Sequence, residues 1–171
     1  GLVGSEMCIR DRNNNCLVLG LGNTLLSDEG IGVHVIRHLQ QDANLDAGVT
    51  CMDGGTLSFT LAESIESTDR LIVVDATELD AAPGTVQVYE NEGMDEFIGS
   101  NRKRSVHEVS LLDLLAIARL TDSLPGRRAL VGIQPQHVDW GDTPTEAVQA
   151  AIGPACSAIH TLIERWRQWA A

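Results

Sequence analysis

Two carboxylates and a histidine occupy positions in this sequence where metal chemistry is feasible. Glu29 follows the first expected strand, Asp75 directly follows the apolar run "LIVV", and His107 precedes an expected helix. The loops after parallel strands gather at one edge of a sheet, so these side chains are expected on the same rim. Carboxylate oxygens and imidazole bind zinc, nickel or iron without a thiolate. Their types and positions favour a mixed oxygen and nitrogen metal site.

Each of these residues also has a simpler explanation. Asp28, beside Glu29, is explained on its own by helix capping, and Glu29 by the favourable charge of an acid in a first helical turn. His107 alone is typical of a surface or capping histidine. Asp75 is harder to explain in this way, because a carboxylate after four apolar strand residues is partly desolvated and needs a partner or a cation.

The segment "LGLGNTLLSDEGIGVHV", residues 19–35, resembles a dinucleotide-binding loop in having Gly20-x-Gly22 after a strand. Leu25 stands where the third glycine, which permits close packing of helix on strand, would be. Asp28 and Glu29 would repel a pyrophosphate at the start of the helix. A Rossmann-like nucleotide-binding module stays open as an alternative, and the acids argue against it.

Strand and helix patterns alternate along the chain, which predicts a three-layer α/β/α sandwich with a mainly parallel, twisted sheet of about five strands. A polar stretch is interpreted as a surface loop, and Gly153-Pro154 is expected to kink or split the last helix. The expected strands are 16–21, 49–55, 70–76, 85–90 and 127–135, the helices 29–41, 57–65, 111–120 and 144–169, and the loop 91–106. Ser110 and Asp113 suggest a capping box at the start of helix 111–120.

Composition narrows the class of protein. The 171 residues carry a formal net charge of -12, opposite in sign to that of a typical nucleic-acid binder, so no nucleic-acid partner is expected. The sequence contains no run of about 18 apolar residues, so no membrane span is expected. The four cysteines form no CxxC pair, which favours free thiols in a reducing compartment. Residues 1–15 match neither a strand nor a helix pattern, and are interpreted as a disordered tail or a gene-model artefact.

Five motifs together resemble the nickel–iron hydrogenase maturation endopeptidases. "LGLGNTLLSDEGIGVHV", "DGGT", "LIVVDA", "HEVSLLDLL" and "GIQP" occur in that family's order and spacing, from about Cys16 to the C-terminal helix. The resemblance implies one maturation protease domain over 16–171, located in the cytoplasm and expected to be a monomer. Its substrate would be a hydrogenase large-subunit precursor, from which it removes a short C-terminal extension after nickel has been inserted.

The resemblance also implies roles for particular residues. Nickel, carried by the precursor, would be recognised by Glu29, Asp75 and His107. Either the nickel activates the peptide bond or a water, or Asp75 acts as general base; the sequence leaves both open. The family is often grouped with aspartic-type peptidases, although the paired motifs of pepsin-like enzymes are absent here. The remaining alternative is a chaperone that binds the large subunit without cutting it. Residues expected in the substrate cleft are Asn23, Asp28, Gly54, Gly55 and Thr56.

Overall fold

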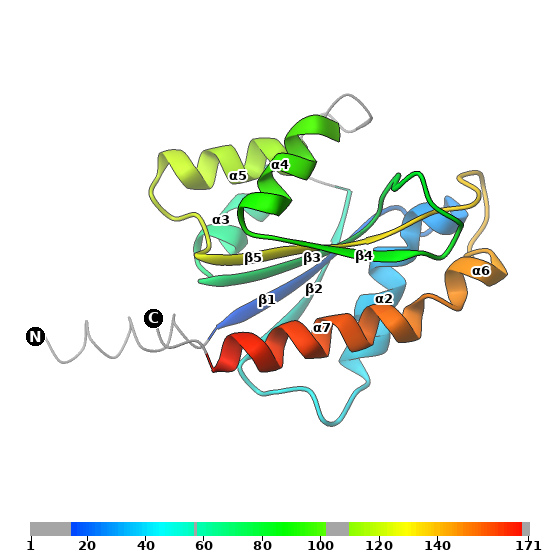
Figure 1. Ribbon diagram of the computed structural model, residues 1–171, viewed down its shortest axis with the longest axis horizontal. Coiled ribbons are helices and arrows are strands. Elements are labelled where there is room, and N and C mark those ends of the chain that lie inside the picture. Colours follow the sequence, from blue (N-terminus) through cyan, green and yellow to red (C-terminus); the bar gives the residue numbers. More distant parts are fainter. Residues whose placement is uncertain (1–14, 57, 102–109, 169–171) are drawn as a thin grey trace, which may run out of the picture.

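The computed structural model describes residues 15–56, 58–101 and 110–168, which are built around one five-stranded sheet (Figure 1). The strand order is β2-β1-β3-β5-β4, and every neighbouring pair is parallel except β4 with β5. This confirms the predicted fold class. The strands are β1 (Cys16–Leu21), β2 (Val49–Gly55), β3 (Arg70–Ala76), β4 (Val86–Glu90) and β5 (Arg127–Ile133).

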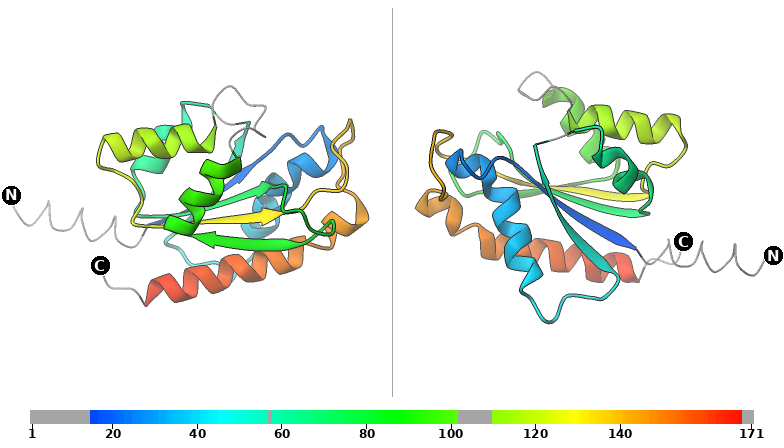
Figure 2. Two further views of the ribbon diagram at one scale, coloured as in Figure 1. Left: turned by 45° about the horizontal axis from the view of Figure 1, so that its top comes forward. Right: turned by 180° about the vertical axis from the view of Figure 1, so that it is seen from behind.

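Helices cover both faces of the sheet, as the views from two sides show (Figure 2). Alternate residues of a strand point to opposite faces, so each strand feeds two cores. Val18 and Ile72 pack in the core under α2 (Ile31–Gln40) and α7 (Ile152–Arg167). Leu19 and Leu71 pack in the other core, under α3 (Leu61–Glu66), α4 (Glu92–Asn101) and α5 (Leu111–Leu120). In the described part of the chain no helix is long and apolar enough to cross a membrane.

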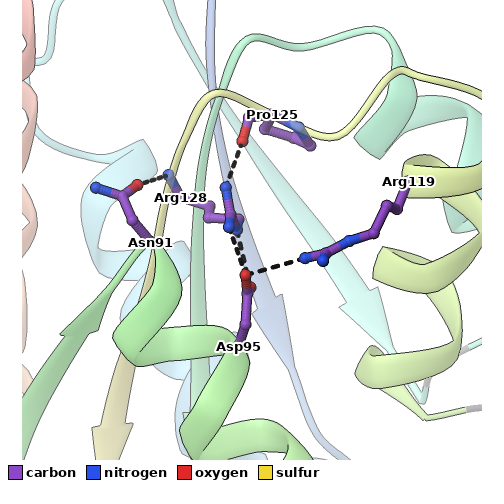
Figure 3. Close-up of polar contacts among 5 residues, drawn as sticks. All are labelled: Asn91, Asp95, Arg119, Pro125 and Arg128. Carbon is purple, nitrogen blue, oxygen red and sulfur yellow. Dashed lines mark hydrogen bonds and ion pairs between the residues drawn. The ribbon is translucent and has the colours of Figure 1, made fainter.

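The prediction of a surface loop over 91–106 is wrong for its first part, because residues 92–101 form α4. Two features hold this polar helix on the sheet. Met94 is fully buried in the second core. Asp95 accepts a 2.9 Å hydrogen bond from Nε of Arg128, a buried residue of β5, and a 3.1 Å bond from Nη2 of Arg119 (Figure 3). A buried guanidinium needs such a partner, so the ion pair fixes α4 in place. Residues 102–106 lie outside the described residues.

Several element boundaries also differ from those expected. Helix α3 begins at Leu61, later than the predicted start at 57. The C-terminal segment is split as expected, but between α6 (Glu146–Gln149) and α7, ahead of Gly153-Pro154. Pro154 lies in the first turn of α7, where its missing N–H has no intrahelical partner to lose. The capping box is confirmed: Asp113 N–H donates to the Ser110 hydroxyl and Ser110 N–H to the Asp113 carboxylate.

The loop after β1 brings α2 unusually close to the sheet. A Cβ on Gly32 would lie 2.2 Å from the carbonyl oxygen of Val74 and 2.4 Å from that of Leu21. A Cβ on Gly20 would lie 2.4 Å from the carbonyl oxygen of Gly32. The helix therefore packs closely against the strands although the third glycine of the dinucleotide-binding motif is absent. Gly32, inside the helix, permits this close packing. The leucine at position 25 takes no part in this packing and is exposed.

Candidate active site

Glu29 and Asp75 meet at the carboxyl edge of the sheet, between β1 and β3. Glu29 lies in the 3-10 turn η1 (Ser27–Gly30) that follows β1, and Asp75 is the second-last residue of β3. Burial and, to a smaller extent, the negative charge of Glu29 raise the pKa of Asp75 to about 7, against one backbone hydrogen bond from Ala76 that lowers it. Asp75 therefore exchanges its proton near neutral pH, which suits a general acid or base.

The loop before Glu29 folds back to hold its carboxylate. Asn23 N–H donates to Oε2 of Glu29 at 2.7 Å, and Glu29 N–H donates to the carbonyl of Leu26 at 3.1 Å. The Asn23 side-chain oxygen accepts from Leu25 N–H at 2.9 Å. Gly22 has a φ of 128° and a Cβ there would lie 1.9 Å from the Glu29 carbonyl oxygen, so only glycine permits this close turn. The position of Glu29 is thus set by its own loop.

A polar pocket of about 310 Å³ lies between the loops after β1 and β2. It contains three residues predicted for the substrate cleft, Asn23, Gly55 and Thr56. Gly54 does not line it: a Cβ at Gly54 would lie 2.9 Å from the side chains of two core leucines. The two loops are joined by Gly22 N–H donating to the Gly55 carbonyl at 2.8 Å. The full lining is Gly22, Asn23, Thr24, Val33, Asp53, Gly55 and Thr56.

Asp53 lines this pocket and was not selected from the sequence. Its Oδ1 accepts a 2.9 Å hydrogen bond from Gly55 N–H, which supports the left-handed conformation of Gly55 at a φ of 52°. The signal was present, because an acid directly before Gly-Gly at the end of a strand is typical of an Asx turn. Asp53 adds a third carboxylate to the rim that carries Glu29 and Asp75.

Asp28, which was predicted for the substrate cleft, is fully buried and does not line the polar pocket. It caps no helix either, since α2 begins after Gly30 without a side-chain cap bond. Its Oδ2 accepts from the N–H groups of Gln136 and His137 at 2.8 and 2.9 Å, and its Oδ1 from Thr145 N–H at 2.6 Å. Burial alone would raise the pKa of Asp28, but these hydrogen bonds outweigh it and hold the pKa below its usual value. Asp28 therefore braces η1 against the loop that follows β5.

Gln134, in the motif "GIQP", is a second buried connector that the sequence analysis missed. Its side-chain oxygen accepts from Leu79 N–H at 2.6 Å, and its side-chain nitrogen donates to Glu78 at 3.1 Å. These bonds tie the loop after β5 to the loop after β3. A polar side chain at the end of an apolar strand was the available signal, of the same kind that drew attention to Asp75.

His107 lies outside the described residues, so its place in the site stays a prediction. Within residues 15–56, 58–101 and 110–168, no three His, Cys, Asp or Glu side chains are grouped so as to hold a metal ion. The structure thus brings together two of the three predicted ligands, Glu29 in the turn after β1 and Asp75 near the end of the neighbouring strand β3.

Comparison with known proteins places this arrangement in a family. A model of the family described as hydrogenase maturation protease matches residues 33–162. The chain is 39% identical over 153 residues to the hydrogenase expression/formation protein HupM of Azotobacter chroococcum, covering 88% of this chain and 73% of that one. It is 37% identical over 146 residues to the hydrogenase 2 maturation protease of Escherichia coli, covering 84% and 87%.

Solved structures give the same answer. The hydrogenase maturating endopeptidase HybD of E. coli superposes with a TM-score of 0.82 at 34% identity, over 88% of this chain and 93% of that one. The [NiFe] hydrogenase maturation protease HybD of Thermococcus kodakarensis gives a TM-score of 0.71 at 26% identity, over 87% and 99%. The chain with its paired rim carboxylates therefore belongs to the hydrogenase maturation protease family, and it is a hydrolase of the peptidase class.

Proposed function

We propose that this protein removes a short C-terminal extension from a hydrogenase large-subunit precursor that already carries nickel. The observation that supports it is the convergence of Glu29 and Asp75 at one rim of the sheet, where burial of Asp75 and then the charge of Glu29 raise the pKa of Asp75 towards neutrality. Two carboxylates this close repel each other and together attract a cation. The resemblance to the family leads us to propose nickel of the precursor as the cation and His107 as the third ligand.

The raised pKa of Asp75 gives this recognition a chemical consequence. Because burial and the charge of Glu29 raise its pKa to about 7, the metal-free carboxyl group retains its proton at a much higher pH than an ordinary aspartate. An arriving cation favours the ionised form, so binding releases the proton. The ionised Asp75 can then take a proton from water as the water attacks the scissile carbonyl, and return it to the leaving amine as the C–N bond breaks. On this proposal the substrate's metal prepares the base that the cleavage needs.

The test uses a purified precursor in nickel-loaded and nickel-free forms, incubated anaerobically with the protein and analysed by intact mass. The loaded form is expected to lose its extension and the nickel-free form to stay intact. Glu29→Gln and Asp75→Asn should each slow cleavage by at least about 100-fold, the usual scale for a group acting in the transition state. Asp122→Asn, an exposed acid in the turn after α5, is the matched control and should cleave normally.

Two outcomes would overturn the proposal. Cleavage of the nickel-free precursor at the same rate would remove the role of the metal. A stable complex with the loaded precursor and no cleavage would favour the chaperone alternative. We also propose that the protein acts in the cytoplasm as a monomer, and that it is an aspartic-type peptidase only in the sense that Asp75 is its base. A sedimentation mass of 18.4 kDa would support the monomer.

A further inference from the structure

An apolar surface lies beside the candidate active site and is left uncovered by the residues that the structure describes. Leu25, Val138 and Trp140 are 58%, 54% and 77% exposed. They are three of the six exposed large apolar side chains in the described residues, and they come from two segments only, the loop after β1 and the loop after β5. We call these three residues the rim patch.

The two segments run side by side as a short parallel bridge. Gly141 N–H donates to the Leu25 carbonyl at 2.9 Å, and Ser27 N–H donates to the Gly141 carbonyl at 2.8 Å. The Ser27 hydroxyl donates to the Asp139 carbonyl at 2.9 Å. Trp140 therefore lies between two residues that are hydrogen-bonded to the Leu25–Ser27 segment. The rim patch is therefore formed by two adjacent segments, although Leu25 is more than 100 positions away in sequence from Val138 and Trp140.

The backbone under the rim patch is held more firmly than an ordinary loop. Fully buried Asp28 fixes the stretch from Gln136 to Thr145, as described above. Ser27 adopts a left-handed φ of 49°, which costs a non-glycine residue of the order of 1 kcal/mol. The buried carboxylate of Asp28 thus fixes this loop, and the fold tolerates the strained backbone of Ser27, although the outward apolar side chains of the loop add little to stability. Such pre-organisation lowers the entropic cost of binding.

The rim patch is joined to the candidate site by hydrogen bonds. Leu25 N–H donates to the Asn23 side chain, and Asn23 N–H donates to the Glu29 carboxylate. Asn23 also lines the polar pocket. A protein bound over the rim patch would therefore contact, at Leu25, the same loop that carries Glu29.

We infer that the rim patch is the docking surface for the folded body of the large-subunit precursor, through an apolar area next to its extension. This rests on the proposed function. A processing enzyme must grip a folded protein while one end of it enters the site, and the acids of this rim, Glu29, Asp53 and Asp75, can attract the metal but offer no apolar contact. The rim patch supplies that contact from the same loop.

A second copy of the chain fits the rim patch less well than a substrate does. A stable dimer buries about 1,200–2,000 Å² in total. Three side chains bury only a few hundred square ångströms, since even a large aromatic contributes about 150–250 Å². An anchor of this size, centred on a tryptophan, suits a transient complex of enzyme and substrate.

The inference separates two parts of recognition. The rim patch is uncharged, so it should contribute equally to binding of the nickel-loaded and the nickel-free precursor, and its contribution should not depend on salt. Glu29 and Asp75 should contribute only to the loaded form. Their substitution should therefore abolish the difference between the two forms, whereas substitution of the rim patch should preserve it.

The experiment measures the dissociation constants of both precursor forms by calorimetry, and kcat and KM with the loaded form. Trp140→Ser and Leu25→Ser should each weaken binding of both forms about 10- to 30-fold, the range for an aromatic or apolar anchor, and raise KM with kcat changed less than twofold. The control is Leu120→Ser, which removes an 87% exposed leucine at the end of α5, near the opposite edge of the sheet, and should change binding less than twofold.

Both rim patch variants should unfold at the same denaturant concentration as the wild type, because the removed side chains are exposed; if one does not, the other supplies the test. Affinities equal to that of the control variant would overturn the inference while leaving the proposed function intact. A wild-type dimer that Trp140→Ser converts to a monomer would also overturn it, by making a second copy the occupant. If the wild type bound the loaded precursor and failed to cut it, the proposed function alone would fail.

Discussion

Replacing Asp28 with asparagine tests whether this buried carboxylate holds the site together. The substitution keeps the size of the side chain and removes one acceptor oxygen and the charge. Both oxygens of Asp28 now accept backbone hydrogen bonds, Oδ1 from Thr145 and Oδ2 from Gln136 and His137. Whichever way the amide is oriented, its NH2 group must face at least one backbone N–H donor.

The expected loss of stability follows from these contacts. In the better orientation the amide oxygen keeps two N–H partners, and the N–H of Thr145 is left buried without an acceptor, which costs about 1–3 kcal/mol. The two bonds that remain lose their charge assistance, at about 1 kcal/mol each. The sum is about 3–5 kcal/mol, which lowers the melting temperature of a chain of this length by roughly 6–20 °C.

The assay is denaturant unfolding of wild type and Asp28→Asn between pH 3 and pH 7. The pKa of Asp28 lies below its usual 3.8 in the folded protein. A depressed pKa contributes stability above the unfolded value of 3.8, and this stability is lost as the pH falls through the folded pKa. The difference between the two proteins should be constant above about pH 5 and shrink below about pH 3.8. The control Asp142→Asn, an exposed acid on the same loop, should change stability by less than about 0.5 kcal/mol. A loss below about 1 kcal/mol for Asp28→Asn, or a loss independent of pH, would refute the reasoning.

Three further substitutions test other parts of the structure. Asp75→Asn should stabilise the metal-free protein above pH 7 and lose that advantage as the pH falls from about 7 to about 4, because the raised pKa of Asp75, about 7, makes the wild type lose stability as the pH rises from 3.8 through 7. Equal unfolding midpoints at pH 8 would contradict this. Gly32→Ala should lower the free energy of unfolding by at least about 2 kcal/mol, because the added Cβ meets two carbonyl oxygens. The control Gly153→Ala, which has open space around it in α7, should be neutral or slightly stabilising in the same denaturant titration. Similar effects of the two substitutions would contradict the packing argument. Asp95→Asn should lower the free energy of unfolding by about 2–4 kcal/mol, because it leaves the guanidinium of buried Arg128 without a charged partner. Native-state hydrogen exchange should show reduced protection in α4 first. Unchanged protection of α4 would count against its anchoring by this pair.

The sheet and the two rim acids were predictable because their signals are local. β3 is a run of apolar residues bounded by polar ones, and its length and position in the alternating pattern fix it in a parallel sheet. Asp75 stands out within that run, and Glu29 stands directly after a glycine turn. No knowledge of distant contacts was needed to place these side chains at the same edge.

The role of Asp28 was not predictable in this way, because its partners are 108 to 117 positions away in sequence. In the sequence an acid before a helix is typical of a cap, and nothing nearby distinguishes it from one. Helix α4 was missed for the same reason. Its segment is polar, and it is fixed by an arginine 33 positions away and by the stacking of Phe97 on Tyr89, whose ring centroids are 4.0 Å apart.

The 3-10 turn η1 explains how two adjacent acids have opposite roles. A 3-10 helix has three residues per turn, so neighbouring side chains diverge by about 120°. Asp28 is thereby directed to the loop after β5, where it is fully buried and fixes the backbone beneath the rim patch. Glu29 is directed to the loop after β1 and to Asp75, where its charge acts on the proton of that residue. Exchanging the two functions would require each carboxylate to leave the donors that hold it, so Asp28 and Glu29 are not interchangeable although they are neighbours. The turn thus fixes the distance between the surface that would hold the substrate and the acids that would act on it.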